Sequence, residues 1–215
     1  MDLHIAESKN DVRYVLAKSI RVITVPPVMA AMLLVVLRNY VQGAVFKTYD
    51  FLFSMIFLAI LPFLAYPVSY ILPEIRCKGR EGQRNLAFVL NAIGYTCAAV
   101  YGIIANVSDS LMLIFLTYFL SVIILSVFNK VLNIRASGHA CSIFGPLVLL
   151  VYFMGIKFAV PCIIVFALIC WASVQIGRHT FKELMLGAFS AAVAFVFSTF
   201  FASFAVFLRS IGILT

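Results

Sequence analysis

Charged residues are scarce in this sequence. Only 11% of its 215 residues are Asp, Glu, Lys or Arg, while 64% are hydrophobic; soluble domains carry about 25% charged residues, so a soluble domain is excluded. Strict alternation of apolar and polar residues is absent from the long apolar runs, which excludes a membrane-spanning β-barrel. The sequence instead contains uninterrupted apolar runs of roughly 17 residues or more. These predict an all-α, polytopic integral membrane protein, because helices satisfy their own backbone groups in lipid.

Other signatures are missing as well. The five cysteines have no CxxC spacing and fall mostly within apolar runs, so we interpret them as small buried residues and not as a disulfide or zinc framework. The N-terminal residues carry Lys9, Arg13 and Lys18 beside acids and lack a short apolar core with a small-residue cleavage site. We therefore expect no cleaved signal peptide. The net charge of +8 resides in loops between apolar runs, where membrane topology and anionic headgroups explain it better than a nucleic-acid partner does.

The apolar runs predict one membrane domain over residues 1–215, with a polar N-terminal segment at 1–19. Six or seven transmembrane helices are expected. The first is short, and Pro26 and Pro27 near its start would kink or delay it; without it, six helices remain. The expected spans are residues 22–37, 51–72, 86–106, 111–128, 140–156, 158–175 and 184–208.

The basic residues are distributed unevenly across these spans. With seven spans, twelve of the 16 lysines and arginines fall on one side of the membrane, together with the loops near 73–85, 129–139 and 176–183. The positive-inside rule places this side in the cytoplasm. We therefore expect a multi-pass protein, in the plasma membrane of a prokaryote, whose richest polar loops face the cytoplasm. The four basic residues on the opposite side are Arg38, Lys47, Lys157 and Arg209.

Two of the three histidines, His139 and His179, lie at the mouths of long uncharged runs. The two apolar runs between them are enough to cross a bilayer and return, so both histidines are expected on the same side. Glu183 follows His179 by four residues, and on one helical turn its carboxylate can accept the Nδ1 proton, which leaves Nε2 as an oriented nucleophile. Ser137 and Gly138 open the helix that carries His139, so that its first N–H groups face an anion. His139 is then the candidate proton donor to a leaving alcohol.

A surplus of basic residues accompanies these histidines on the same side. It favours an anionic substrate embedded in the membrane, and phosphate is the natural partner of several arginines. Two histidines and a glutamate could bind zinc or iron, but the arginines would repel a cation, so we expect no metal and no cofactor. The expected partners are a lipid phosphate substrate and the bilayer. The basic candidates for substrate binding are Lys78, Arg80, Arg84, Arg135 and Arg178.

These residues resemble the type 2 phosphatidic acid phosphatase superfamily of membrane lipid phosphatases, whose motifs are K-x6-R-P, P-S-G-H and S-R-x5-H-x3-D. Residues 136–139 (Ala-Ser-Gly-His) resemble the second motif, with alanine in place of proline. His179 and Glu183 resemble the histidine and acid of the third, with glutamate in place of aspartate. The first motif is the poorest match, because aligning it on Arg84 puts Cys77 in place of the lysine and Asn85 in place of the proline. The resemblance covers about residues 73–195.

The resemblance implies a metal-independent lipid phosphate or diphosphate phosphatase that acts through a phosphohistidine on His179. Ser137, Gly138 and the nearby arginines would then hold the phosphoryl oxygens. The third-motif arginine falls on Ser173, and losing a charged donor to a transition state costs about 3 kcal/mol, roughly a hundredfold in rate. Arg178 and Arg135 are the candidates to replace it.

Two other functions stay open. The substitution at Ser173 and the altered first motif favour a catalytically inactive relative that binds anionic lipid or a protein partner. A small transporter or channel is the third possibility, and the near absence of charges in the middle of the spans argues against it.

Overall fold

The structure is a computed structural model that describes residues 12–41 and 46–210, with side chains as far as Ala202. The part of the predicted N-terminal segment before Val12, including His4 and Lys9, lies outside the described residues. Within the described ranges every regular element is a helix, which confirms the all-α prediction. In chain order the elements are α2 (Val12–Ile23), α3 (Pro26–Tyr40), α4 (Thr48–Met55), η1 (Ile56–Ile60), α5 (Leu61–Phe63), α6 (Ala65–Ile71), α7 (Pro73–Arg76), α8 (Gly79–Ile104), α9 (Asp109–Ser126), η2 (Val127–Val131), α10 (Gly138–Met154), η3 (Ile156–Phe158), α11 (Ala159–Gln175) and α12 (Phe181–Ser210).

Five helical stretches of the described chain are long and apolar enough to cross a membrane. A sixth span results if the bent pair α2 and α3 counts as one, and α10 is a shorter apolar helix of 17 residues, near the lower limit for spanning. Large apolar side chains, such as Ile104 and Ile163, are exposed on the outer faces of these helices, where a bilayer would cover them. The chain is therefore an integral, multi-pass membrane protein. The five long stretches are Thr48–Ile71, Gly79–Ile104, Asp109–Val131, Ile156–Gln175 and Phe181–Ala202.

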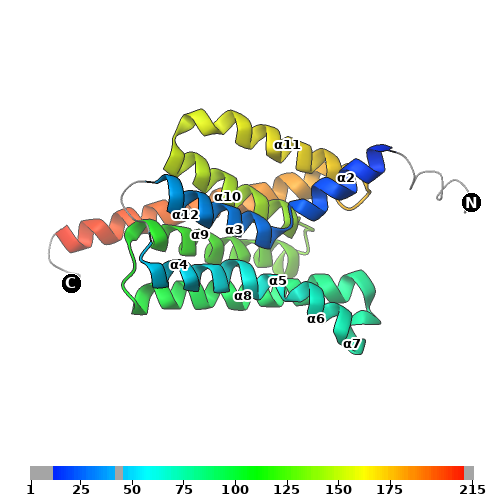
Figure 1. Cartoon of the computed structure of the whole chain (residues 1–215), viewed down its shortest axis with the longest axis horizontal. Coiled ribbons are helices and arrows are strands. Elements are labelled where there is room, and N and C mark those ends of the chain that lie inside the picture. Colours follow the sequence, from blue (N-terminus) through cyan, green and yellow to red (C-terminus); the bar gives the residue numbers. More distant parts are fainter. Residues whose placement is uncertain (1–11, 42–45, 211–215) are drawn as a thin grey trace, which may run out of the picture.

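Helix α9 lies at the centre of the bundle. It packs against α8, α10 and α12, while α3 packs against α10 and η1, and α2 packs along α11. The long helices run roughly along the longest axis of the molecule (Figure 1). Fully buried side chains such as Leu33, Phe115 and Leu149 fill the space between them.

The predicted start of the first span, at residue 22 of the range 22–37, is wrong. The chain is already helical from Val12 to Ile23, breaks, and resumes at Pro26 with the two helices bent by 56°. Val25 adopts an extended conformation, with φ −62° and ψ 146°. Proline disfavours a helical conformation in the residue before it but is well suited to the first turn of a helix, so the proline pair ends one helix and starts the next.

The basic stretch 73–85, expected as a loop, is also largely helical. Its first residues form α7, and Arg80 and Arg84 lie on the first turns of α8. These turns, the end of α2, and the α9–α10 and α11–α12 connections all lie at one end of the bundle (Figure 1). The fold therefore gathers the polar loops expected on one membrane side.

Candidate functional site

The α11–α12 connection positions His179. Gly177 follows the end of α11 by two residues and has φ +65°, a conformation that glycine adopts without a steric penalty. The Arg178 N–H then donates to the Ser173 carbonyl at 3.0 Å. Thr180 then caps α12, because its Oγ1 accepts the Glu183 N–H at 3.3 Å. His179 therefore precedes α12 and does not lie on the same helical turn as Glu183, which is a correction to the prediction.

His179 and Glu183 nevertheless meet. The Nδ1 atom of His179 lies 2.8 Å from Oε2 of Glu183, and the two side chains are only 13% and 15% exposed. The other carboxylate oxygen, Oε1, lies 3.5 Å from Nε of Arg135. A carboxylate that accepts the Nδ1 proton sets the tautomer of the ring and leaves the Nε2 lone pair free.

The surroundings keep the His179 ring neutral. Burial away from water lowers its pKa, the hydrogen bond and the charge of Glu183 raise it, and the charges of Arg21 and Arg135 lower it, with a net downward shift. A histidine whose pKa lies below its ordinary value is unprotonated at neutral pH. The Nε2 atom is therefore available as a nucleophile under physiological conditions.

The α9–α10 connection carries the second motif and is bonded directly to α12. The Ser137 N–H donates to the Glu183 carbonyl at 2.9 Å, and the Ser137 Oγ caps α10 by accepting the Ala140 N–H at 3.2 Å. Gly187 of α12 permits this approach, because a Cβ at that position would collide with the Ser137 carbonyl oxygen. The two histidine motifs are thus joined by their backbones.

His139 lies in the first turn of α10. Its Nε2 atom is buried and has no hydrogen-bond partner among the described residues. The charged and titratable groups that act on it are Arg21, His179 and Arg178. The two imidazoles therefore share one electrostatic environment, although 40 positions separate them in the sequence. Gly138 precedes His139 as the first residue of α10.

The remaining basic candidates lie at different distances from this pair. Arg178 is largely exposed. The partial burial of its guanidinium and the charge of Arg80 lower its pKa, an effect that the phenol of Tyr14 partly offsets. Arg84 is 61% exposed and pairs with Glu81 of its own helix at 3.9 Å. Lys78 is exposed just before α8. Among the described residues, no hydrogen bond or ion pair links Lys78 or Arg84 to the histidines.

Arg21 is the residue that sequence reasoning missed, since it counted only toward membrane topology. Its Nη1 donates a hydrogen bond to Ser173 Oγ at 3.0 Å across 152 positions of sequence, and Ser173 is fully buried. No spacing motif could reveal such a contact. It depends on α2 lying along α11, which follows from the helix break before Pro26.

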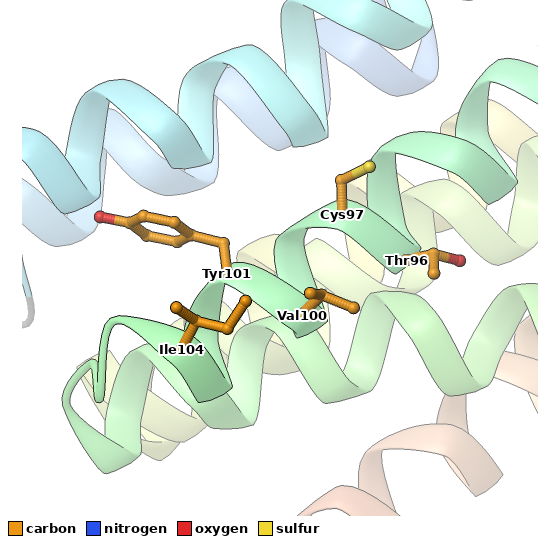
Figure 2. A pocket seen from close by; sticks show the side chains of 5 residues that line it. All are labelled: Thr96, Cys97, Val100, Tyr101 and Ile104. Atoms are coloured by element: carbon orange, nitrogen blue, oxygen red, sulfur yellow. The ribbon is translucent and has the colours of Figure 1, made fainter.

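An open pocket lies elsewhere, on one face of α8. Thr96, Cys97, Val100, Tyr101 and Ile104 line it, and its volume is about 310 Å³ (Figure 2). Its lining is almost entirely apolar and includes neither histidine. This pocket is therefore separate from the candidate site at the histidines.

The chain matches no protein-family model, no curated protein and no solved structure. Within the described residues, no three His, Cys, Asp or Glu side chains come together in an arrangement that could hold a metal ion.

Proposed function

We propose that this chain is a membrane lipid phosphatase that hydrolyses a phosphate ester or diphosphate of an isoprenoid or glycerolipid. The observation that carries the proposal is the 2.8 Å contact between His179 and Glu183, in an environment shared with His139 and several arginines. An imidazole held by a carboxylate is a common nucleophile arrangement, and arginines are suited to phosphoryl oxygens. The resemblance of the two histidine motifs to membrane lipid phosphatases supports the same chemistry.

The proposed reaction has two steps. The Nε2 of His179 attacks phosphorus in line with the leaving oxygen, so that a P–N bond forms as the P–O bond to the lipid breaks. His139 gives its proton to the departing oxygen; burial and the charges of Arg21 and Arg178 lower the pKa of His139, so this step requires that the bound phosphate anion first restores its protonated form. In the second step His139 takes a proton from water, the water oxygen attacks phosphorus, and the P–N bond breaks to release phosphate and free His179. Positioning and arginine charges supply the stabilisation of the transition state.

The lipid tail enters the site sideways from the bilayer in this proposal. The start of α10 and the α11–α12 connection, which carry the histidines, lie at one end of a bundle whose outer faces are apolar. This arrangement supports a headgroup at the loops and a tail between or beside the helices. A site at the end of the bundle suits phosphatidate-type lipids and isoprenyl diphosphates equally.

Phosphate release from detergent-purified protein tests the proposal. Wild type is incubated with phosphatidate and with an isoprenyl diphosphate, and free phosphate is measured against a variant with His139→Ala and His179→Ala. We expect release from at least one lipid by wild type alone. Equal rates for both proteins on every lipid would contradict the proposal that the chain is a lipid phosphatase. Stabilisation of wild type by inorganic phosphate without turnover would instead favour the inactive relative that binds anionic lipid. The ion pair between Arg135 and Glu183 supports this alternative, because it engages two side chains that the reaction would use.

The excess of basic residues on this side supports a site on the cytoplasmic face of the membrane, which we propose to be the plasma membrane of a prokaryote. We expect cysteines introduced by Arg80→Cys and Arg178→Cys, in a variant whose native cysteines are replaced by alanine, to resist a membrane-impermeant maleimide applied to intact cells. Lys157→Cys is the matched control, because Lys157 is exposed in η3, on the opposite connection of α10 and α11. Labelling at positions 80 and 178 but not at 157 would reverse this topology.

A further inference from the structure

Arg21 reaches the histidine site from an element outside both histidine motifs. It lies in the last turn of α2, donates to Ser173 Oγ at 3.0 Å, and its charge acts on both His139 and His179. Ser173 is an uncharged partner that can orient a guanidinium but cannot neutralise it. Among the described residues, no carboxylate lies within ion-pair distance of Arg21.

The charges around the two histidines do not balance without a ligand. Arg21, Arg135 and Arg178 contribute three positive charges to their surroundings, and Glu183 is the acid that acts there within the described part of the chain. Both oxygens of Glu183 are already engaged, one by His179 and one by Arg135. A partly buried cation without a counter-charge is unfavourable, so the arrangement favours binding of an anion.

Arg21 is also the right kind of donor for that anion. A guanidinium presents a planar fork of N–H groups, so it can donate to Ser173 with one group and to two phosphoryl oxygens with others. The break between α2 and α3 allows α2 to leave the direction of α3 and lie along α11, which places Arg21 beside Ser173. Position 173 is where the resemblance to lipid phosphatases expects an arginine.

We propose that Arg21 binds the phosphoryl group of the substrate and supplies, from α2, the positive charge that a residue at position 173 does not carry. This inference rests on the proposed function. It replaces Arg178 and Arg135 as the candidates for that role, because Arg178 is exposed and Arg135 is paired with Glu183.

The test is to move the charge between the two contacting positions. Arg21→Gln is expected to lower phosphate release about a hundredfold and to abolish the thermal stabilisation of the purified protein by inorganic phosphate. Adding Ser173→Arg to Arg21→Gln should raise the rate of phosphate release by at least about tenfold and should restore the thermal stabilisation by phosphate. The reason is that the guanidinium returns to nearly the same place. Ser173→Arg alone should not raise the rate, because it crowds two guanidiniums together. Lys18→Gln, the same loss of charge at an exposed position of α2, is the control and should leave both measurements unchanged.

The outcomes separate this inference from the proposed function. Wild-type turnover and wild-type response to phosphate in Arg21→Gln would overturn the role of Arg21 while leaving the phosphatase intact. If wild type hydrolyses no lipid but Arg21→Gln still loses its response to phosphate, the proposed function fails and the anion contact stands. Should Arg21→Gln fail to fold, Arg21→Lys decides: a reduced rate with a raised KM supports the contact, and wild-type constants overturn it.

Discussion

Replacing His179 with alanine is expected to lower phosphate release by about 10⁴-fold or more, because removal of an enzymatic nucleophile has effects of this size or larger. Alanine leaves no atom that can form the P–N bond. The position lies in the α11–α12 connection and not within a helix of the bundle, so the fold should survive the substitution. The rate is measured on the lipid that wild type hydrolyses fastest, and thermal unfolding is measured in the same detergent.

A matched histidine substitution is available as the control. His4→Ala makes the same chemical change outside both motifs and should keep the wild-type rate. The stability of the trapped phosphoryl group in acid and in base also tests the mechanism. Wild type given a ³²P-labelled substrate should carry label that survives base and is lost in acid, as expected for a phosphoramidate. His179→Ala should carry none. A His179→Ala protein with wild-type turnover would exclude His179 as the nucleophile.

Glu183 should matter through His179 and not by touching the substrate. Its carboxylate holds Nδ1 at 2.8 Å and so leaves Nε2 unprotonated. By itself Glu183 raises the pKa of His179, but burial and the neighbouring arginines lower it further than Glu183 raises it, so the ring stays neutral. The nucleophile is therefore prepared by two independent features, a hydrogen bond that selects the tautomer and an environment that disfavours the imidazolium.

Local patterns in the sequence predicted much of the fold and part of the site. Uninterrupted apolar runs predicted the helices, because lipid imposes a minimum length on a spanning segment. The spacing of four residues predicted the contact between His179 and Glu183, since neighbours this close in sequence need little tertiary structure to meet. Ser137 was predicted to open a helix, and its hydroxyl caps α10.

The contacts that escaped prediction are those between distant segments. The hydrogen bond from Arg21 to Ser173 and the ion pair between Arg135 and Glu183 depend on how α2, α11 and the α9–α10 connection pack. Hydrophobic periodicity does not specify such packing in a membrane protein, because lipid-facing and helix-facing surfaces are both apolar. The helix break before Pro26 was recognisable as a kink, but the direction in which α2 leaves is a tertiary property.

Replacing Gly187 with alanine is expected to damage the site although Gly187 itself would not contact the substrate. The added Cβ would collide with the Ser137 carbonyl oxygen and lie 3.2 Å from the Ala140 Cβ, so α12 and the start of α10 must separate. Separation strains the 2.9 Å hydrogen bond between the Ser137 N–H and the Glu183 carbonyl, which joins the two histidine motifs. A displacement of about 1 Å in a reacting group can cost about a hundredfold in rate, and overpacking of this kind typically costs about 1–3 kcal/mol of stability.

Gly145→Ala provides the matched control for this prediction. Gly145 is a glycine of α10 that faces α12, but a Cβ there would meet only the Ala191 Cβ at 3.9 Å, an ordinary van der Waals distance. We expect Gly145→Ala to keep the wild-type rate and melting temperature, and Gly187→Ala to lose about a hundredfold in rate with a lower melting temperature. If both variants behave like wild type, the close approach of α12 to Ser137 is not what aligns the two histidines. If both are equally impaired, the effect belongs to the α10–α12 interface in general, whereas a defect confined to Gly187→Ala ties it to the contact beside the site.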